Sequence, residues 1–161
     1  MQKFFEELCK SFDLRLQYNV DSAVLIDPQS GAYMEISVEE YFTDSEKSAT
    51  ISEYTVRFST QHRHFDSFKE VEKYVRSILS DEVLPIEFFD NSRAKFGGEI
   101  KKEDLNGISA QRLAQMFGYT AEYISQFYYE LHSWSGKNDI KRTKVSDIGK
   151  KVKALPKKDI L

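Results

Sequence analysis

The order of hydrophobic and polar residues predicts a helix, a hairpin and a third strand in the first part of the chain. Residues 2–12 place four apolar side chains at helical spacing, which is typical of an amphipathic helix. Residues 22–37 hold two short apolar runs around the turn sequence Asp27-Pro-Gln-Ser-Gly31 and predict a β-hairpin. Residues 38–49 are polar and acidic, and we expect a short helix and a loop there. Apolar and polar residues alternate over residues 51–60, which predicts a strand with one buried face.

A second helix and two further strands are expected next. A capping box begins at Ser67, so a helix should run from there to about Asp81. Residues 83–89 and 94–100 have the composition of strands. Because Pro85 has no backbone N–H to donate, it favours either an edge strand or a position at the start of a strand.

These elements follow one another in the order α-β-β-β-α-β-β. Packing the helices on one face of an antiparallel sheet buries their apolar sides, so the sequence predicts an α+β fold, followed by a C-terminal helical hairpin and a basic tail. Over residues 2–100, the element order resembles that of type III secretion chaperones and related acidic adaptor domains. The resemblance implies a domain that binds a protein partner.

The net charge of −3 is unevenly distributed along the chain. Residues 1–92 carry 9 Lys and Arg against 18 Asp and Glu, hence −9, whereas residues 136–161 carry 9 against 3, hence +6. This asymmetry indicates an acidic body and a basic interaction tail. We therefore expect an acidic α+β domain over residues 1–100, a helix-turn-helix-like unit over residues 101–135, and a partly helical basic tail after it.

Composition and hydropathy point to one compartment. The single cysteine, Cys9, excludes an intrachain disulfide and favours a reducing environment. No apolar run reaches the roughly 20 residues that a membrane helix needs. Acidic residues also stand near the start of the chain, where a secretory signal needs an apolar core. We expect a cytoplasmic protein without a membrane partner.

Residues 110–129 resemble the helix-turn-helix signature of bacterial DNA-binding proteins. The small residue Ala114 stands where a second helix would cross the first one closely. Gly118 follows four positions later, in a turn that needs a positive φ. Ile124, six positions beyond the glycine, is expected to pack the second helix inward.

Two capped helices are expected in this segment. Ser109 caps the first, Ala110–Phe117, and Thr120 caps the second, from Ala121 to about His132. The resemblance implies that the second helix enters a major groove. It would present Thr120, Glu122, Ser125, Gln126 and Tyr129. Because this helix has no Lys or Arg, phosphate contacts are expected from other residues. Those residues are Arg112, Lys141, Arg142, Lys150 and Lys151.

Two features leave alternatives open. The basic tail either grips DNA, is solvated, or folds back through a helical stripe of apolar residues between Val145 and Leu155. A group of aromatic residues exceeds what one helix pair can bury, so we expect a seam with the α+β domain or a homodimer surface. The group consists of Phe127, Tyr128, Tyr129 and Trp134.

The clearest candidate for chemistry is Gln61-His-Arg-His64. On a strand, His62 and His64 project to the same face and could ligate one metal ion. A third ligand would have to come from elsewhere, such as Asp66 or Glu70, and the sequence has no second cluster of ligands. We therefore favour a polar strand end that faces water, and expect no metal site. There is no glycine-rich phosphate loop, nucleophile elbow or zinc-protease motif. We expect neither an enzyme nor a cofactor.

Two functions from different classes follow from these patterns. The first is a small DNA-binding regulator or accessory protein that uses the helix-turn-helix and the basic tail on duplex DNA. The second is a protein-interaction module, acting as an adaptor, chaperone or inhibitor through an acidic face. That face would consist of Glu35, Glu39, Glu40, Asp44, Glu46 and Glu53.

Overall fold

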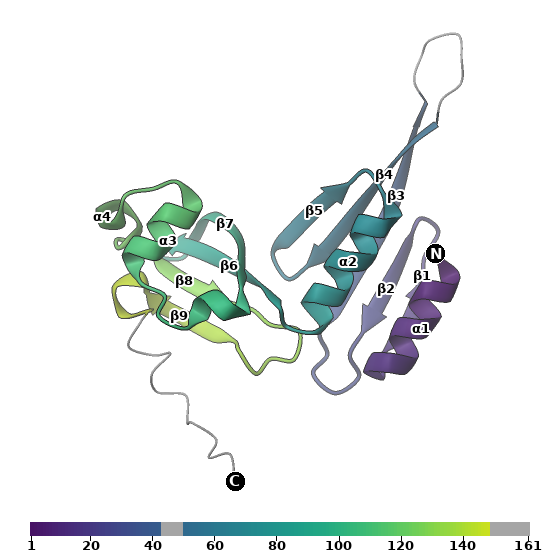
Figure 1. The fold of residues 1–161 in the computed structure, drawn as a ribbon, viewed down its shortest axis with the longest axis horizontal. Coiled ribbons are helices and arrows are strands. Elements are labelled where there is room, and N and C mark those ends of the chain that lie inside the picture. Colours follow the sequence, from purple (N-terminus) through teal and green to yellow (C-terminus); the bar gives the residue numbers. More distant parts are fainter. Residues whose placement is uncertain (43–49, 149–161) are drawn as a thin grey trace. The chain divides into compact units, whose positions relative to one another are not determined.

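The structure of the chain, a computed structural model, describes residues 1–42 and 50–148 (Figure 1). Helices are combined with antiparallel sheets throughout, so the predicted mixed α+β character is confirmed. The chain forms two compact units. The first comprises Met1–Asp81 with Trp134–Gly136, and the second comprises Glu82–Ser133 and the chain from Lys137 onward.

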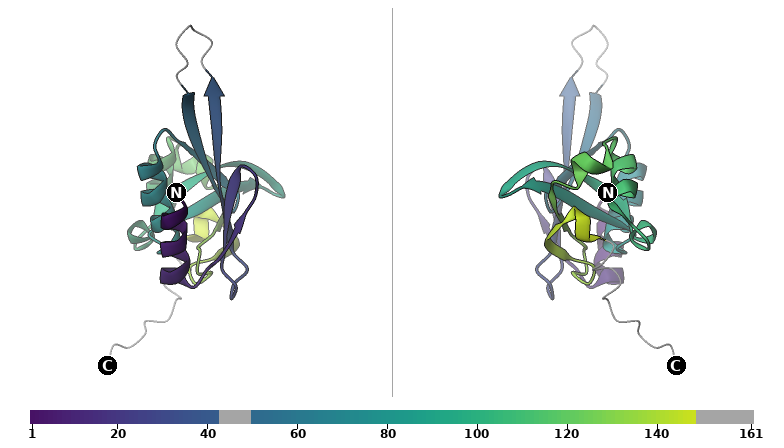
Figure 2. Two further views of the ribbon diagram at one scale, coloured as in Figure 1. Left: turned by 90° about the vertical axis from the view of Figure 1, so that its right-hand side faces the viewer. Right: turned by 90° about the vertical axis from the view of Figure 1, so that its left-hand side faces the viewer.

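The first unit is a five-stranded antiparallel sheet with two helices (Figure 1). Its elements are α1 Gln2–Phe12, β1 Arg15–Tyr18, β2 Ser22–Ile26, β3 Tyr33–Phe42, β4 Thr50–Phe58, β5 Gln61–Phe65 and α2 Phe68–Leu79. The strands pair in sequence order, β1-β2-β3-β4-β5. β3 and β4 extend past the other strands as a two-stranded ribbon, most clearly in Figure 2.

Strand register sorts the side chains of this sheet onto two faces. Ile36 pairs with Ala23 on one side and Val56 on the other, and all three are buried. Helix α2 packs on this apolar face, where the ring of Phe68 lies 5.7 Å from that of Tyr54. Because side chains alternate along a strand, the intervening residues of β3, β4 and β5 form an opposite, polar face.

A short segment from the loop after β8 completes the first unit. Trp134 is 4% exposed, and its ring lies 5.6 Å from that of Phe58. The backbone N–H of Ser135 donates to Asp81 at 3.1 Å, and the Ser135 hydroxyl donates to the other oxygen of that carboxylate. These bonds satisfy a carboxylate that is otherwise largely withdrawn from water.

The second unit contains a four-stranded antiparallel sheet and two short helices. Its elements are β6 Val83–Asp90, β7 Arg93–Lys101, the 3-10 turn η1 Lys102–Leu105, α3 Ala110–Phe117, α4 Ala121–Ile124, β8 Tyr128–Leu131, β9 Ile140–Lys144 and the 3-10 turn η2 Val145–Asp147. The strand order is β7-β6-β8-β9. β6 is therefore a central strand.

Pro85 lies near the start of this central strand, so of the two predicted placements the edge strand is wrong and the position close to the strand start is found. The carbonyl of Pro85 accepts from the N–H of His132 at 2.9 Å, on the β8 side. In a strand the N and C=O of one residue point to the same side, so the missing N–H also faces β8. β8 ends at Leu131, so Pro85 lies at the end of the β6–β8 hydrogen-bond ladder, where a missing N–H interrupts no further pairing.

Other expectations about the order of elements are also wrong. Five strands rather than three precede α2, and residues 38–42 continue β3 instead of forming a helix. β6 and β7 pair with β8 and β9 rather than with the first sheet, so the units divide after Asp81 and not at residue 100. β9 lies in the segment predicted as tail. The expected loop over residues 43–49 lies outside the described residues, as does the tail after Ile148.

Helix α3 approaches β7 so closely that no side chain fits at Gly98. In the aromatic core, the Phe88 ring stacks on Phe96 at 4.6 Å and meets Phe117 edge-on at 5.3 Å. A Cβ atom at Gly98 would lie 2.5 Å from Cε1 of Phe117. Glycine is therefore needed here for space rather than for backbone freedom.

Replacing Gly98 by alanine should lower the free energy of unfolding by about 1–3 kcal/mol, because the packed Phe117 ring must move. Urea denaturation measures this loss. Gly97→Ala is the matched control, since Gly97 is exposed and its side chain would point to the other face of the strand. An equal loss of stability in both variants would show that the contact with Phe117 is not the cause.

Candidate protein-interaction surface

As predicted, the segment from α3 to α4 has a side-chain cap at the start of each helix and a left-handed glycine, Gly118, between them. Ser109 caps α3, and the Thr120 hydroxyl caps α4 by accepting from the N–H of Tyr123 at 3.2 Å. Gly118 has φ 73°, and this turn lets the N–H of Tyr119 donate to the carbonyl of Ala114 at 2.8 Å. Leu113, Ala114 and Ile124 are buried and hold the two helices together.

The second helix is much shorter than predicted. α4 contains four residues and ends at Ile124, whereas a helix to about His132 was expected. Residues 128–131 form β8 instead, with Tyr129 opposite Phe88 of β6. Tyr129 is 1% exposed, so its prediction as a groove-facing side chain is wrong. A single helical turn cannot supply the extended reading face that a recognition helix presents to DNA.

The other predicted contacts of this helix are only partly available. Glu122 and Gln126 are exposed. The Thr120 hydroxyl is used as a cap, and the Ser125 hydroxyl donates to the carbonyl of Ala121 at 2.6 Å. These hydroxyls stabilise the turn of α4 rather than point to a ligand.

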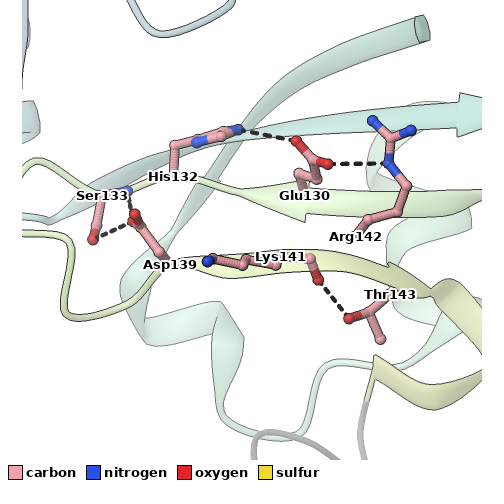
Figure 3. A network of polar contacts seen from close by, with 7 residues as sticks. All are labelled: Glu130, His132, Ser133, Asp139, Lys141, Arg142 and Thr143. Atoms are coloured by element: carbon pink, nitrogen blue, oxygen red, sulfur yellow. Dashed lines mark hydrogen bonds and ion pairs between the residues drawn. The ribbon is translucent and has the colours of Figure 1, made fainter. Parts of the chain in front are cut away.

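The predicted basic contacts are not gathered beside α4. Arg112 lies on α3, where its Nη2 atom is 3.4 Å from Asp104. Arg142 of β9 donates to Glu130 at 3.0 Å (Figure 3). It also donates to the carbonyl of Asn91 at 3.0 Å. Its guanidinium carbon also lies 3.7 Å from the centre of the Phe89 ring, a cation–π contact. Arg142 is therefore occupied within its own sheet.

Lys141 is exposed and precedes Arg142 on β9. In the loop between β8 and β9, the Asp139 carboxylate holds Ser133 (Figure 3). The backbone N–H and the hydroxyl of Ser133 both donate to Asp139, at 2.7 and 2.9 Å. Lys150 and Lys151 lie outside the described residues. The described part of the second unit thus does not collect the predicted phosphate-binding residues on one face.

Three large side chains are instead exposed on the segment from α3 to α4. Met116 is 37% exposed, Tyr119 40% and Tyr123 44%. The rings of Tyr119 and Tyr123 lie 5.2 Å apart. Each also contacts a ring of the core beneath: Tyr119 meets Phe96 at 4.7 Å, and Tyr123 meets Phe127 at 5.0 Å. We call Met116, Tyr119 and Tyr123 the tyrosine patch.

This patch was not among the predicted surfaces. The aromatic residues expected at a seam or dimer surface were Phe127, Tyr128, Tyr129 and Trp134, but Phe127 and Tyr129 belong to the core of the second unit and Trp134 is buried in the first. The available signal was the spacing of Tyr119 and Tyr123, four residues apart at the start of a helix. Residues at that spacing share one face.

The polar face of the first unit holds the remaining candidates. Glu35 pairs in register with Arg57, with an ion pair of 3.5 Å, and Glu39 stands opposite Glu53. A shallow hollow of about 750 Å³ lies beside them, lined in part by residues 19–22. Of the predicted acidic face, the side chains of Glu40, Asp44 and Glu46 are outside the described part of the chain.

His62 and His64 lie on this polar face, as the spacing predicted. Their ring centroids are 5.4 Å apart. Nδ1 of His64 lies 2.8 Å from the Glu53 carboxylate and 3.2 Å from the Thr55 hydroxyl. In the described residues, no group of three or more His, Cys, Asp or Glu side chains is arranged to hold a metal ion.

Comparison with protein-family models, curated proteins and solved structures found no match for this chain. Among the described residues, none of the helices has the length and apolar character that crossing a membrane requires.

The buried Tyr129 hydroxyl has an unusual environment. Burial raises the pKa of Tyr129 to about 12, and the nearby carboxylate of Asp147 adds to the shift. Within the described residues, the hydroxyl has no hydrogen-bond partner. The folded state therefore retains the Tyr129 proton at a pH where an unfolded chain has lost it.

Because the pKa of Tyr129 is raised from 10.0 to about 12, its stabilising contribution should be complete below pH 10 and fall as the pH rises toward 12. Urea unfolding across this window should show a decline in stability that is less steep in Tyr129→Phe. Near neutral pH the variant should be about as stable as the wild type, because it loses a hydroxyl without a partner. Identical pH dependence of the two proteins would contradict this assignment.

Proposed function

We propose that this protein is a protein-interaction module that binds a partner protein through the tyrosine patch. The observation that carries the proposal is the exposure of Tyr119 and Tyr123, 40% and 44%, whose rings lie 5.2 Å apart and rest on core rings. Met116, on the preceding helix, is 37% exposed. Tyrosine and methionine are enriched in protein interfaces, and tyrosine is frequent among the residues that dominate binding energy.

The aromatic support beneath the patch favours binding. Phe96 contacts both Tyr119 and Phe127, at 4.7 and 5.3 Å, and Phe127 in turn contacts Tyr123. Rings held in this way lose little conformational entropy when a partner covers them. The patch is thus ordered before binding.

The surroundings of the patch also suit a protein partner. Gln115, Glu122 and Gln126 are exposed on the same two-helix segment and provide polar groups around the apolar centre. A hydrophobic centre with a polar rim is the usual anatomy of a protein interface. The exposed charged residues of this segment are Glu122 and Arg112, and Arg112 is paired with Asp104.

DNA binding by this unit stays a prediction with less support. Phosphate neutralisation by Lys and Arg supplies most of the non-specific affinity for DNA, and α4 has neither residue. Arg112 and Arg142 are engaged by Asp104 and Glu130. Any contact with DNA would depend on lysines elsewhere, including Lys150 and Lys151.

The double substitution Tyr119→Ser/Tyr123→Ser should weaken binding of the partner by about 30-fold or more, because loss of an interface hot spot costs roughly 2 kcal/mol or more. A partner captured from native host extract by wild-type protein would be purified and its affinity measured by calorimetry. Tyr33→Ser is the matched control, since Tyr33 is 64% exposed but lies in the first unit.

A photo-crosslinking amino acid provides an independent readout of position. Placed at Met116, it should capture the same partner, whereas placed at Tyr33 it should not. Full affinity of the double variant, or an equal loss in Tyr33→Ser, would overturn the proposal. A mobility shift of duplex DNA at low salt that is retained by the double variant would instead favour the DNA-binding alternative.

A further inference from the structure

The polar face of the first unit contains a pair of histidines whose arrangement suits a metal ion. His62 and His64 are exposed on β5, the edge strand of the sheet, and project to the same side. Their ring centroids lie 5.4 Å apart. We propose that His62 and His64 together bind one divalent transition-metal ion of the Zn²⁺ class through their Nε2 atoms.

One imidazole is already held in the tautomer that such a site requires. Nδ1 of His64 lies 2.8 Å from a carboxylate oxygen of Glu53. An ionised carboxylate accepts hydrogen bonds but cannot donate one. The proton of a neutral ring must therefore be on Nδ1, and the lone pair on Nε2. The Thr55 hydroxyl, 3.2 Å from the same nitrogen, further fixes the ring. Carboxylate–histidine pairs of this kind are the usual support of a metal-ligating histidine.

The spacing of the rings permits a shared ion. Metal–nitrogen distances for histidine are about 2.0–2.1 Å, and small rotations about the side-chain bonds can bring both Nε2 atoms to that distance from one ion. Among the described residues, no hydrogen bond to Nε2 of either ring is found, so binding breaks no such contact. Imidazole is a preferred ligand of zinc, copper and nickel.

The charges that face the pair favour a cation overall. Arg57 stands opposite His62 in register, but it forms an ion pair with Glu35 at 3.5 Å. Glu39 and Glu53 stand opposite each other on the adjacent strands. Glu53 is in contact with the pair, through Nδ1 of His64.

Arg63, between the two histidines, points to the other face. Its guanidinium lies 5.6 Å from the Phe65 ring and 5.3 Å from the Tyr74 ring. It therefore does not add positive charge beside the histidine pair. Among the described residues of β3 and β4 on the polar face, the carboxylates of Glu35, Glu39 and Glu53 outnumber the guanidinium of Arg57.

Two protein nitrogens make an open site rather than a closed structural one. Structural zinc sites use four protein ligands, and catalytic sites usually use three. Water or a donor from another molecule would complete the coordination of an ion held by His62 and His64. Such a site is expected to exchange its metal readily and to be accessible from solvent.

Calorimetric titration of untagged full-length protein with ZnCl₂ at pH 7.5 tests the proposal. We expect one saturable equivalent of Zn²⁺ per chain, and loss of saturable binding in both His62→Ala and His64→Ala. His132→Ala is the control, because His132 lies in the second unit, and it should bind Zn²⁺ as the wild type does. Circular dichroism would verify that each variant is folded.

The role of Glu53 is tested separately as a positioning residue. Glu53→Gln keeps an oxygen that can accept from Nδ1 but removes the charge, and it should weaken Zn²⁺ binding by about 10- to 100-fold. Absence of saturable binding to wild-type protein, or persistence of binding in the double variant His62→Ala/His64→Ala, would overturn the metal site. Unchanged affinity in Glu53→Gln would overturn the carboxylate's part in it.

Discussion

Pairing of β8 with β6 is the interaction on which the second unit depends. It places Tyr129 opposite Phe88 and Leu131 opposite Ile86, and all four side chains are buried. The pairing joins segments far apart in the sequence and draws the chain out of helical geometry after Ile124. β8 then provides the edge on which β9 adds, so the sheet grows from this one contact.

The same pairing decides which aromatic side chains reach the surface. The strand turns Tyr129 inward, whereas Tyr119 and Tyr123, in the turn and the short helix before it, remain outside on the core rings of Phe96 and Phe127. It also places Glu130 where Arg142 of β9 can bond to it. Strand formation thus buries Tyr129 and engages Arg142 in an ion pair with Glu130.

In the first unit, the two faces of the sheet have different side chains. Residues that pair with Ile36 on one face form the core, while the alternate residues carry charge and imidazole groups on the other. On that face, Glu35 forms an ion pair with Arg57, and Glu53 lies 2.8 Å from Nδ1 of His64 on the neighbouring strand. The charged groups of the sheet are thus kept away from its core.

The sequence by itself determined the local features of this protein. Helix caps at Ser67, Ser109 and Thr120, the left-handed turn at Gly118, the hairpin over residues 22–37 and the common face of the two histidines were all predictable, because each depends on a few neighbouring residues. Only the tertiary structure decided the partition into two sheets and the end of α4. A segment that can form a helix or a strand takes the form that buries more apolar surface, and that depends on β6, a partner that local periodicity does not reveal.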